Sequence, residues 1–579
     1  MKFGAAQIGA VVSLFAIAAA SPAMAQSNGQ SANDLRLPEA ERDAAAPNMK
    51  VERDGGMKAP CPFDGSELKV TLTGVKFVDA RGGELSDKLV GSLSGVTVPQ
   101  GLQPLSVVCV VRDAANQALR EDGWIASVQV PQQDLQGILR LDVVSARISE
   151  IRVNGNPGPY RNALASVLDP LRALDPLNER DAERILLKAN DIPGLSVRLA
   201  LVPSGEAPGV VIGNLSVDFE RYAAYFNARN YNARSIGRET GFARIDVHGL
   251  TGLSDVTFVG GQTTFDFEEQ YIVQVGHEFG LGPSGLRLGG QFTQAWARPD
   301  IQNLDLESTT TLANVSLSYP LVRTPLKSSN LSLGFDYIDQ DNSVGPVSLS
   351  KDSLRTLYVR ADTQGRIDRI DRSTLVAYSA FAEVRQGLNV FGASGFSGFF
   401  GFAETDGVSA SRPFGDSEAL VVRGGVDATL FINETFDLRT RIEGQWTDDP
   451  LLNFDEYSIG NLSIGRGYDP GANSGDRAIG FSGEVGVKLF EKGASRVQAF
   501  GFYDVVKLEN LDPFTPSPQR TLTSVGGGVR YFMGQGLTAE VAYAKPLDRA
   551  LAIDAEKPPE RVLFSLTTRF PALFRQNRW

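Results

Sequence analysis

The chain contains 579 residues, with 56 Lys or Arg and 68 Asp or Glu, which gives a formal net charge of −12 at pH 7. This acidic balance argues against nucleic acid as a partner. The two histidines, His248 and His277, fall in separate strand-like segments, so neither a histidine metal site nor a Ser-His-Asp hydrolase has support. Because the chain also lacks a Gly-x-x-x-x-Gly-Lys-Ser/Thr motif, we expect no ATP-driven step, no metal, no cofactor and no enzymatic activity.

The first 25 residues have the three parts of a secretory signal peptide. Lys2 supplies a positive charge, residues 8–20 are apolar, and Ala23-Met24-Ala25 offers a small-x-small cleavage site. The apolar part is too short to anchor the protein in a membrane, and no later stretch approaches the roughly 18 apolar residues that a spanning helix needs. We therefore expect a mature protein in the outer membrane or periplasm of a Gram-negative cell.

Residues 26–66 are polar, charged and rich in alanine, which predicts either a disordered leader or a tether with a short helix near residues 32–46. The two cysteines, Cys61 and Cys109, both remain after cleavage of residues 1–25. The oxidising periplasm would permit a disulfide between them, whereas the alternative is two buried free thiols.

The next two segments, residues 67–149 and 150–219, share one order of elements, strand-helix-helix-strand-strand. In the first unit we expect strands near 70–75, 124–130 and 138–144, and helices at 84–94 and 104–122. In the second we expect strands near 151–153, 196–202 and 210–219, and helices at 160–173 and 178–190, the latter capped by Asn178. Two copies of one small α+β fold suggest a binding arm whose exposed strand edge could pair with an extended polypeptide. The alternative is a plain spacer.

Residues 220–579 alternate apolar and polar side chains over many short segments. In residues 436–447, one row is largely apolar and the interleaved row is entirely polar, which is typical of strands with lipid on one side and water on the other. A closed barrel is the only sheet that leaves no backbone edge unpaired in hydrocarbon. These residues could form about sixteen strands of roughly ten residues each, the last of them at Val562–Phe570. The sequence thus predicts a transmembrane antiparallel β-barrel preceded by two α+β units.

One interval of the barrel region, near residues 448–479, lacks alternation, and a loop of that length needs a reason. It contains Gly465-Arg466-Gly467-Tyr468, an arginine and a tyrosine held by glycines in a tight turn. A later strand carries Phe500, Phe502 and Asp504 on one face. If the loop folds into the lumen, Arg466 could pair with Asp504. The alternative is an external loop with a solvated arginine.

At these residues the chain resembles a known superfamily of outer-membrane transporters. Gly465-Arg466-Gly467-Tyr468 is similar to its Val-Arg-Gly-Tyr/Phe loop motif, and Phe500-x-Phe502-x-Asp504 to its strand motif. The resemblance is closer to the two-partner secretion branch, the TpsB or haemolysin secretion/activation transporters, and it covers nearly the whole mature chain. Further segments that resemble this branch lie at residues 122–125, 130–134, 137–141, 190–194, 230–234 and 237–238.

The resemblance implies two periplasmic POTRA domains, at residues 67–149 and 150–219, and a sixteen-stranded barrel at 220–579. It implies that Arg466 lies at the tip of an inward-folded loop and bonds to Asp504 on the barrel wall. Residues 26–66 would correspond to the region where family members have a helix that can plug the pore. The expected partners are a secreted exoprotein, outer-membrane lipid, and the barrel assembly and periplasmic chaperone machinery.

Three features depart from the family pattern. Gly465 replaces the usual valine, which we expect to loosen the turn. The chain continues for nine residues beyond Phe570 to Trp579, whereas family members normally end at their terminal phenylalanine. The pair Cys61 and Cys109 has no counterpart with a role in the family.

We therefore expect a pore that accepts an unfolded exoprotein from the periplasm and passes it to the cell surface. One alternative is an assembly factor that inserts other barrels, and another is a passive porin, which leaves the two periplasmic units unexplained. An outer-membrane hydrolase is disfavoured because no nucleophile and base converge in the sequence pattern.

Overall fold

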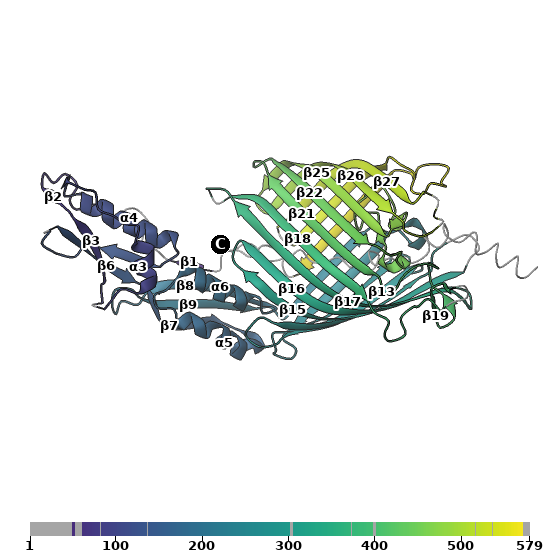
Figure 1. The fold of residues 1–579 in the computed structure, drawn as a ribbon, viewed down its shortest axis with the longest axis horizontal. Coiled ribbons are helices and arrows are strands. Elements are labelled where there is room, and N and C mark those ends of the chain that lie inside the picture. Colours follow the sequence, from purple (N-terminus) through teal and green to yellow (C-terminus); the bar gives the residue numbers. More distant parts are fainter. Residues whose placement is uncertain are drawn as a thin grey trace, which may run out of the picture.

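The structure, a computed structural model, describes residues 49–51, 61–81, 83–135, 137–300, 305–371, 373–397, 401–513, 515, 517–534 and 536–570. The predicted signal peptide, the predicted helix near residues 32–46 and the residues after Phe570 lie outside these ranges. Two small α+β units lie next to each other at one end of the molecule, and a large β-barrel forms the other end (Figure 1). None of the helices within the described ranges has the length and apolar character to cross a membrane.

The first unit packs two helices against a three-stranded sheet with the order β3-β6-β5. Apolar side chains recur at helical spacing along α4, at Val111, Ala115 and Leu119, and they meet Leu139 and Leu141 of β6. Burying each such leucine contributes about 1.5–3 kcal/mol. The elements are β2 Lys69–Thr71, β3 Gly74–Asp79, α3 Asp87–Leu93, β4 Leu102–Pro104, α4 Val107–Glu121, β5 Ala126–Gln129 and β6 Ile138–Ser145.

A disulfide joins Cys61 to Cys109 of α4, and their Cα atoms are 5.8 Å apart. Cys109 is buried on the inner side of the helix. The bond therefore fastens the chain that precedes the first unit to the core of that unit.

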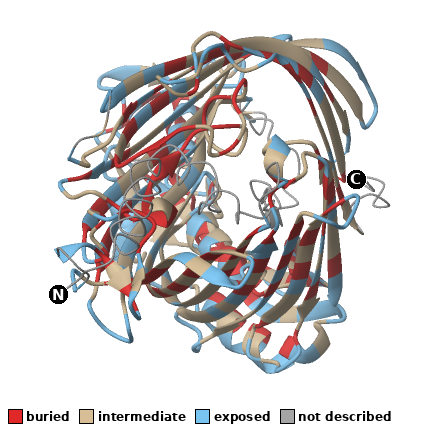
Figure 2. Ribbon diagram, turned by 90° about the vertical axis from the view of Figure 1, so that its right-hand side faces the viewer, coloured by how far each residue is buried: buried red, intermediate tan, exposed pale blue. Residues whose placement is uncertain are grey.

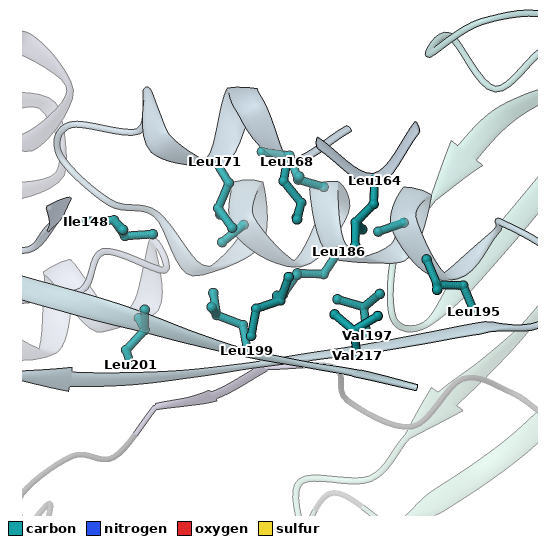
Figure 3. Close-up of a cluster of buried hydrophobic side chains, with 14 of the residues drawn as sticks. Ile148, Leu164, Leu168, Leu171, Leu186, Leu195, Val197, Leu199, Leu201 and Val217 are labelled. Atoms are coloured by element: carbon teal, nitrogen blue, oxygen red, sulfur yellow. The ribbon is translucent and has the colours of Figure 1, made fainter. Parts of the chain in front are cut away.

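The second unit has the same plan. Its two helices cover one face of a sheet, and leucines from the helices meet leucines and valines from the strands (Figure 3). The side chain of Asn178 accepts hydrogen bonds from the backbone N–H groups of Arg180 and Asp181, so it caps the second helix. The elements are β7 Arg147–Gly155, η1 Gly158–Tyr160, α5 Arg161–Arg172, α6 Glu179–Asn190, β8 Leu195–Pro203 and β9 Val210–Phe219.

A short piece of the expected tether adds a strand to this second sheet. Residues 49–51 form β1 (Met49–Val51), which pairs in parallel with β8, and the sheet order becomes β1-β8-β9-β7. Leu195 of β8 lies opposite Phe219, at the end of β9 that leads into the barrel. Because β1 runs parallel to β8, its N-terminal end faces the barrel and its C-terminal end faces the first unit.

The second unit is fixed to the barrel by polar contacts. The hydroxyl group of Tyr160 donates to the backbone oxygen of Asp255 at 2.8 Å, in the turn between two barrel strands. Asp255 is fully buried; burial opposes its ionisation, but hydrogen bonds from Thr251, Leu250 and Leu253 hold the pKa of this carboxyl below its usual value. The second unit therefore contacts a turn whose backbone N–H groups are bound by the Asp255 side chain.

The barrel contains sixteen antiparallel strands and is closed, as the sequence predicts. It closes where β10 pairs with β29, from Ala224 opposite Phe570 to Arg229 opposite Ser565. Asn230 extends this pairing, since its side chain donates to the backbone oxygen of Val562 and accepts from the N–H of Phe564, each at 2.8 Å.

The first eight strands are β10 Tyr222–Arg229, β11 Thr240–His248, β12 Val256–Thr264, β13 Gln270–Gly280, β14 Arg287–Ala297, β15 Leu306–Arg323, β16 Lys327–Val344 and β17 Val347–Asp368. The last eight are β18 Thr374–Gly387, β21 Leu420–Phe431, β22 Phe436–Thr447, β25 Arg477–Lys492, β26 Ser495–Glu509, β27 Gln519–Met533, β28 Leu537–Pro546 and β29 Arg561–Phe570.

The two faces of the wall have opposite character. In β13, Tyr271 and Val273 are 40% and 46% exposed, whereas the alternate residues Gln270, Ile272 and Gln274 are buried. Large apolar side chains thus lie on the outside, and buried polar side chains face the lumen, which is the arrangement that a lipid surround and an aqueous interior require.

The middle strands are longer than the ten residues we expected. β15 and β16 have 18 residues each and β17 has 22. Since about ten residues of a tilted strand already cross the hydrocarbon core, these strands project beyond the membrane. They do so at both ends: β17 starts nine residues before its pairing with β18, which begins at Thr356, whereas the end of β15 reaches the second unit, where Arg323 donates to Asp191 at 2.8 Å.

Removing the disulfide should loosen the first unit. A crosslink that closes a loop of this size stabilises a fold by about 2–4 kcal/mol. We expect the double variant Cys61→Ala/Cys109→Ala to show weaker protection of the α4 amides in hydrogen exchange of the full-length protein, with the β26 amides unchanged. Addition of reductant should reproduce the loss in the parent and have no effect on the variant. Equal protection of α4 in both proteins would contradict this role.

Candidate functional site in the barrel lumen

The loop between β22 and β25 folds into the barrel. We call residues 448–476 the lumenal loop; it contains η4 (Asn453–Asp455), β23 (Tyr457–Ser458) and β24 (Ser474–Gly475). Its apolar residues Ile459, Ile464 and Tyr468 form a buried cluster with barrel residues that include Val506 and Leu522. Figure 2, which shows the barrel from the end opposite the two units, has buried loop segments inside the ring of strands.

Arg466 lies near the tip of this loop and binds Asp504 of β26. Its backbone N–H donates to Asp504 Oδ2 at 2.9 Å, its Nε donates to the same oxygen at 3.1 Å, and its Nη2 donates to Oδ1 at 2.9 Å. The Asp504 side chain is 1% exposed. The two-pronged contact fixes the guanidinium plane as well as its position.

A second carboxylate, which no motif in the sequence marks, completes the site. Glu484 of β25 accepts from Arg466 Nη1 at 2.8 Å and from Arg530 Nη1 of β27 at 3.0 Å. Ser482 of β25 accepts from Arg466 Nη2 at 3.0 Å and donates to Asp504 at 2.7 Å. The arginine of the loop therefore joins a charged network on three neighbouring strands.

The spacing of Phe500, Phe502 and Asp504 follows from the strand period. All three are buried, and alternate residues of a strand point to the same side, here the lumen. The Arg466 guanidinium lies 3.6 Å from the centre of the Phe502 ring, and that of Arg530 lies 4.4 Å from the centre of the Phe500 ring. The aromatic rings thus support two cations that both bind one carboxylate.

The two glycines of the motif have separate structural reasons. Gly465 has φ of 113°, a conformation that side chains with a Cβ rarely adopt. A Cβ at Gly467 would lie 2.8 Å from the backbone nitrogen of Pro546, so this glycine permits close contact with the wall. The glycine that replaces the family's valine therefore fits the backbone here, and the turn is held by close contacts.

Tyr468 connects the tip of the lumenal loop to β27 and to the residues that follow β28. It is fully buried, its hydroxyl donates to the backbone oxygen of Thr523 at 2.9 Å, and this hydroxyl accepts from the N–H of Asp548 at 3.1 Å. Arg561 of β29 donates to the backbone oxygens of Tyr468 at 3.1 Å and of Asn232 at 3.2 Å. The tip is thereby connected to the strands at which the barrel closes.

Among the described residues, no group of three or more His, Cys, Asp or Glu side chains is arranged to hold a metal ion. The geometry is that of a structural brace. It contains fixed charges, aromatic supports and a loop that occupies the lumen.

Comparisons with known proteins agree with this architecture. Residues 210–531 match the family model described as haemolysin secretion/activation protein ShlB/FhaC/HecB. The heme/hemopexin transporter protein HuxB of Haemophilus influenzae (strain 86-028NP) is 22% identical over 83% of this chain and 84% of its own length.

Among solved structures, CdiB from Escherichia coli is similar with a TM-score of 0.66 and 18% identity, over 91% of this chain and 94% of that chain. BamA from Haemophilus ducreyi, lacking its POTRA domains 1–3, has a TM-score of 0.51 and 13% identity, over 87% and 100% of the two chains. The family match covers more than half of the chain, and the fold agrees with it. The chain therefore belongs to the haemolysin secretion/activation protein family and is a Gram-negative outer-membrane transporter that passes a partner exoprotein to the cell surface by two-partner secretion.

Proposed function

We propose that this transporter receives one unfolded exoprotein through its two periplasmic units, which act as POTRA domains, and conducts it along the barrel lumen. The observation that carries the proposal is the lumenal loop held on the inner wall by Arg466, because this contact braces the interior through which an exoprotein would pass. No step requires ATP or covalent chemistry. Folding of the exoprotein outside the cell would prevent its return and supply the driving force.

Strand addition is the mode of capture that we propose for the second unit. Its β8 edge already accepts an extra strand, since residues 49–51 pair with Leu199, Ala200 and Leu201. Backbone pairing of this kind gives affinity without demanding a particular sequence. An extended exoprotein segment could therefore bind the same edge after displacing β1.

The remaining partners follow from the surface and from the export route. The exposed apolar band, with Val273, Ile442 and Leu566 among its members, would contact outer-membrane lipid. A closed barrel that reaches its membrane through the periplasm would need periplasmic chaperones and the barrel assembly machinery. No enzymatic role is part of the proposal.

The Arg466–Asp504 pair is the first test of the mechanism. We expect Arg466→Ala and Asp504→Ala each to lower secretion of the exoprotein at least about tenfold, because each leaves a charge without its buried partner. Barrel assembly, measured by heat-modifiable gel mobility, should persist. Lys507→Ala is the control, since Lys507 lies on the same strand and is exposed. Normal secretion by both variants would refute the proposed role of the pair.

Glu484 should matter through charge as well as through hydrogen bonding. Glu484→Gln keeps an acceptor for one arginine but removes the negative charge that Arg466 and Arg530 share. We expect secretion to fall several-fold, between the parent and Arg466→Ala, and the apparent unfolding temperature of the barrel to decrease. A variant as active and as stable as the parent would show that Asp504 alone holds the loop.

Depletion of the transporter separates secretion from barrel insertion. We expect an inventory of surface proteins by mass spectrometry to lose one exoprotein, with the other outer-membrane barrels unchanged. Broad loss of barrels would instead support an assembly factor. A steady large conductance in planar bilayers, without binding of exoprotein segments, would support a passive porin.

A further inference from the structure

A second segment enters the lumen beside the lumenal loop. Residues 401–419 lie between β18 and β21 and carry the short strands β19 (Glu404–Thr405) and β20 (Val408–Ser409). Ala403 and Ala410 pack with Leu452 and Phe454 of the lumenal loop. Both pairs lie against inward-facing barrel residues, which are Ile272, Ala295, Ile338 and Leu354. The two insertions thus share one hydrophobic cluster at the outer end of the barrel.

Arg412 links this segment to two other loops. Its Nη1 donates to the backbone oxygen of Leu451 at 2.7 Å and to Glu456 Oε1 at 2.8 Å, both in the lumenal loop. Its Nη2 donates to Asp476 Oδ2 at 3.0 Å, and its Nε donates to Asp512 Oδ2 at 2.8 Å in the β26–β27 loop. The Arg412 side chain is only 6% exposed.

The carboxylates around Arg412 are themselves held in place. Asp476 accepts from the backbone N–H of Leu451 at 2.7 Å and of Leu511 at 2.6 Å, and its side chain is fully buried. Glu456 accepts from the hydroxyl of Ser474 at 2.8 Å. Three carboxylates therefore converge on one guanidinium, so loss of Arg412 would leave buried negative charges facing one another without a cation.

We propose that Arg412 is a positioning residue that fastens the 401–419 segment to the stem of the lumenal loop and keeps the outer end of the lumen closed until an exoprotein passes. Arg466 holds the tip of the lumenal loop to the wall, and Arg412 holds its base. The inference rests on the proposed function for its secretion readout. Ion conductance needs no exoprotein, so a conductance measurement tests Arg412 even where the secretion assay fails.

The first experiment records purified full-length protein in planar bilayers. We expect Arg412→Gln to raise the frequency of open events at least about tenfold, because breaking a buried ion cluster removes a large part of what holds the closed arrangement. Arg412→Lys retains the charge but cannot reach all three carboxylates. Its frequency of open events should lie between those of the parent and of Arg412→Gln. Asp406→Asn is the matched control. Asp406 lies in the same 401–419 segment, and its substitution removes only an exposed ion pair with Lys351 of β17. An unchanged frequency in Arg412→Gln, or an equal increase in Asp406→Asn, would overturn the proposal.

A second experiment leaves Arg412 intact. The N–H of Asn453 in the lumenal loop donates to Ser411 Oγ at 3.2 Å, so the two segments touch here, and we choose this pair of positions for an engineered disulfide. We expect Ser411→Cys/Asn453→Cys to block secretion when oxidised and to regain it when reduced. The parent treated with reductant controls for the native Cys61–Cys109 bond. Normal secretion by the fully oxidised pair would show that the two segments need not separate.

The cluster also predicts a dependence on pH. Burial raises the pKa of Glu456 to about 7; Arg412 opposes this shift, and Asp476 and Asp512 add to it. In the released loop the pKa would return towards 4.5, so the closed state binds the proton more tightly and gains stability as the pH falls from about 7 to about 4.5. Open events should be more frequent near pH 8 than near pH 5.5, and Glu456→Gln should reduce the difference. Opening that increases on acidification would contradict the proposal.

Discussion

Backbone hydrogen bonding in hydrocarbon is the constraint on which this architecture depends. An amide group that faces lipid has no water to bind, so a sheet that crosses the membrane has to close on itself. Here closure depends on the short pairing between β10 and β29, which the side-chain amide of Asn230 extends. Arg561 stands at the same place and reaches the tip of the lumenal loop. The closure of the wall and the position of the loop are therefore parts of one network.

A closed wall of sixteen strands encloses more space than its own side chains fill. The structure meets this with two insertions that bring apolar residues against the inner wall and are fastened there by arginine. Each arginine sits among carboxylates on other elements, which makes its position specific in a way that apolar packing alone would not. Apolar contacts hold the two insertions against one part of the wall, and charged contacts fix the positions of the loops.

Features that repeat along the sequence could be predicted from it, whereas contacts between residues far apart in the sequence could not. Alternation revealed the barrel and its two faces, and the spacing of Phe500, Phe502 and Asp504 revealed one side of the site. Glu484, Arg530 and Arg412 carried no such signal, because each lies in an ordinary strand or loop and meets its partner only through strand order. The strand at residues 49–51 is too short for a period, and it forms only because β8 offers an open edge. Strand length was underestimated for β15 to β17 because alternation does not report where the hydrocarbon ends.

The disulfide at Cys61 limits how far the residues that precede it can move from the first unit. The roughly 12 residues from Met49 to Cys61 span at most about 42 Å when extended. If an exoprotein segment displaced β1 from β8, the disulfide would keep the displaced residues close to the first unit. Their high effective concentration would favour renewed pairing with β8 after the exoprotein segment has left. Renewed pairing of β1 with β8 after each transport cycle would then be an intramolecular step, and its rate would not depend on the concentration of transporters in the membrane.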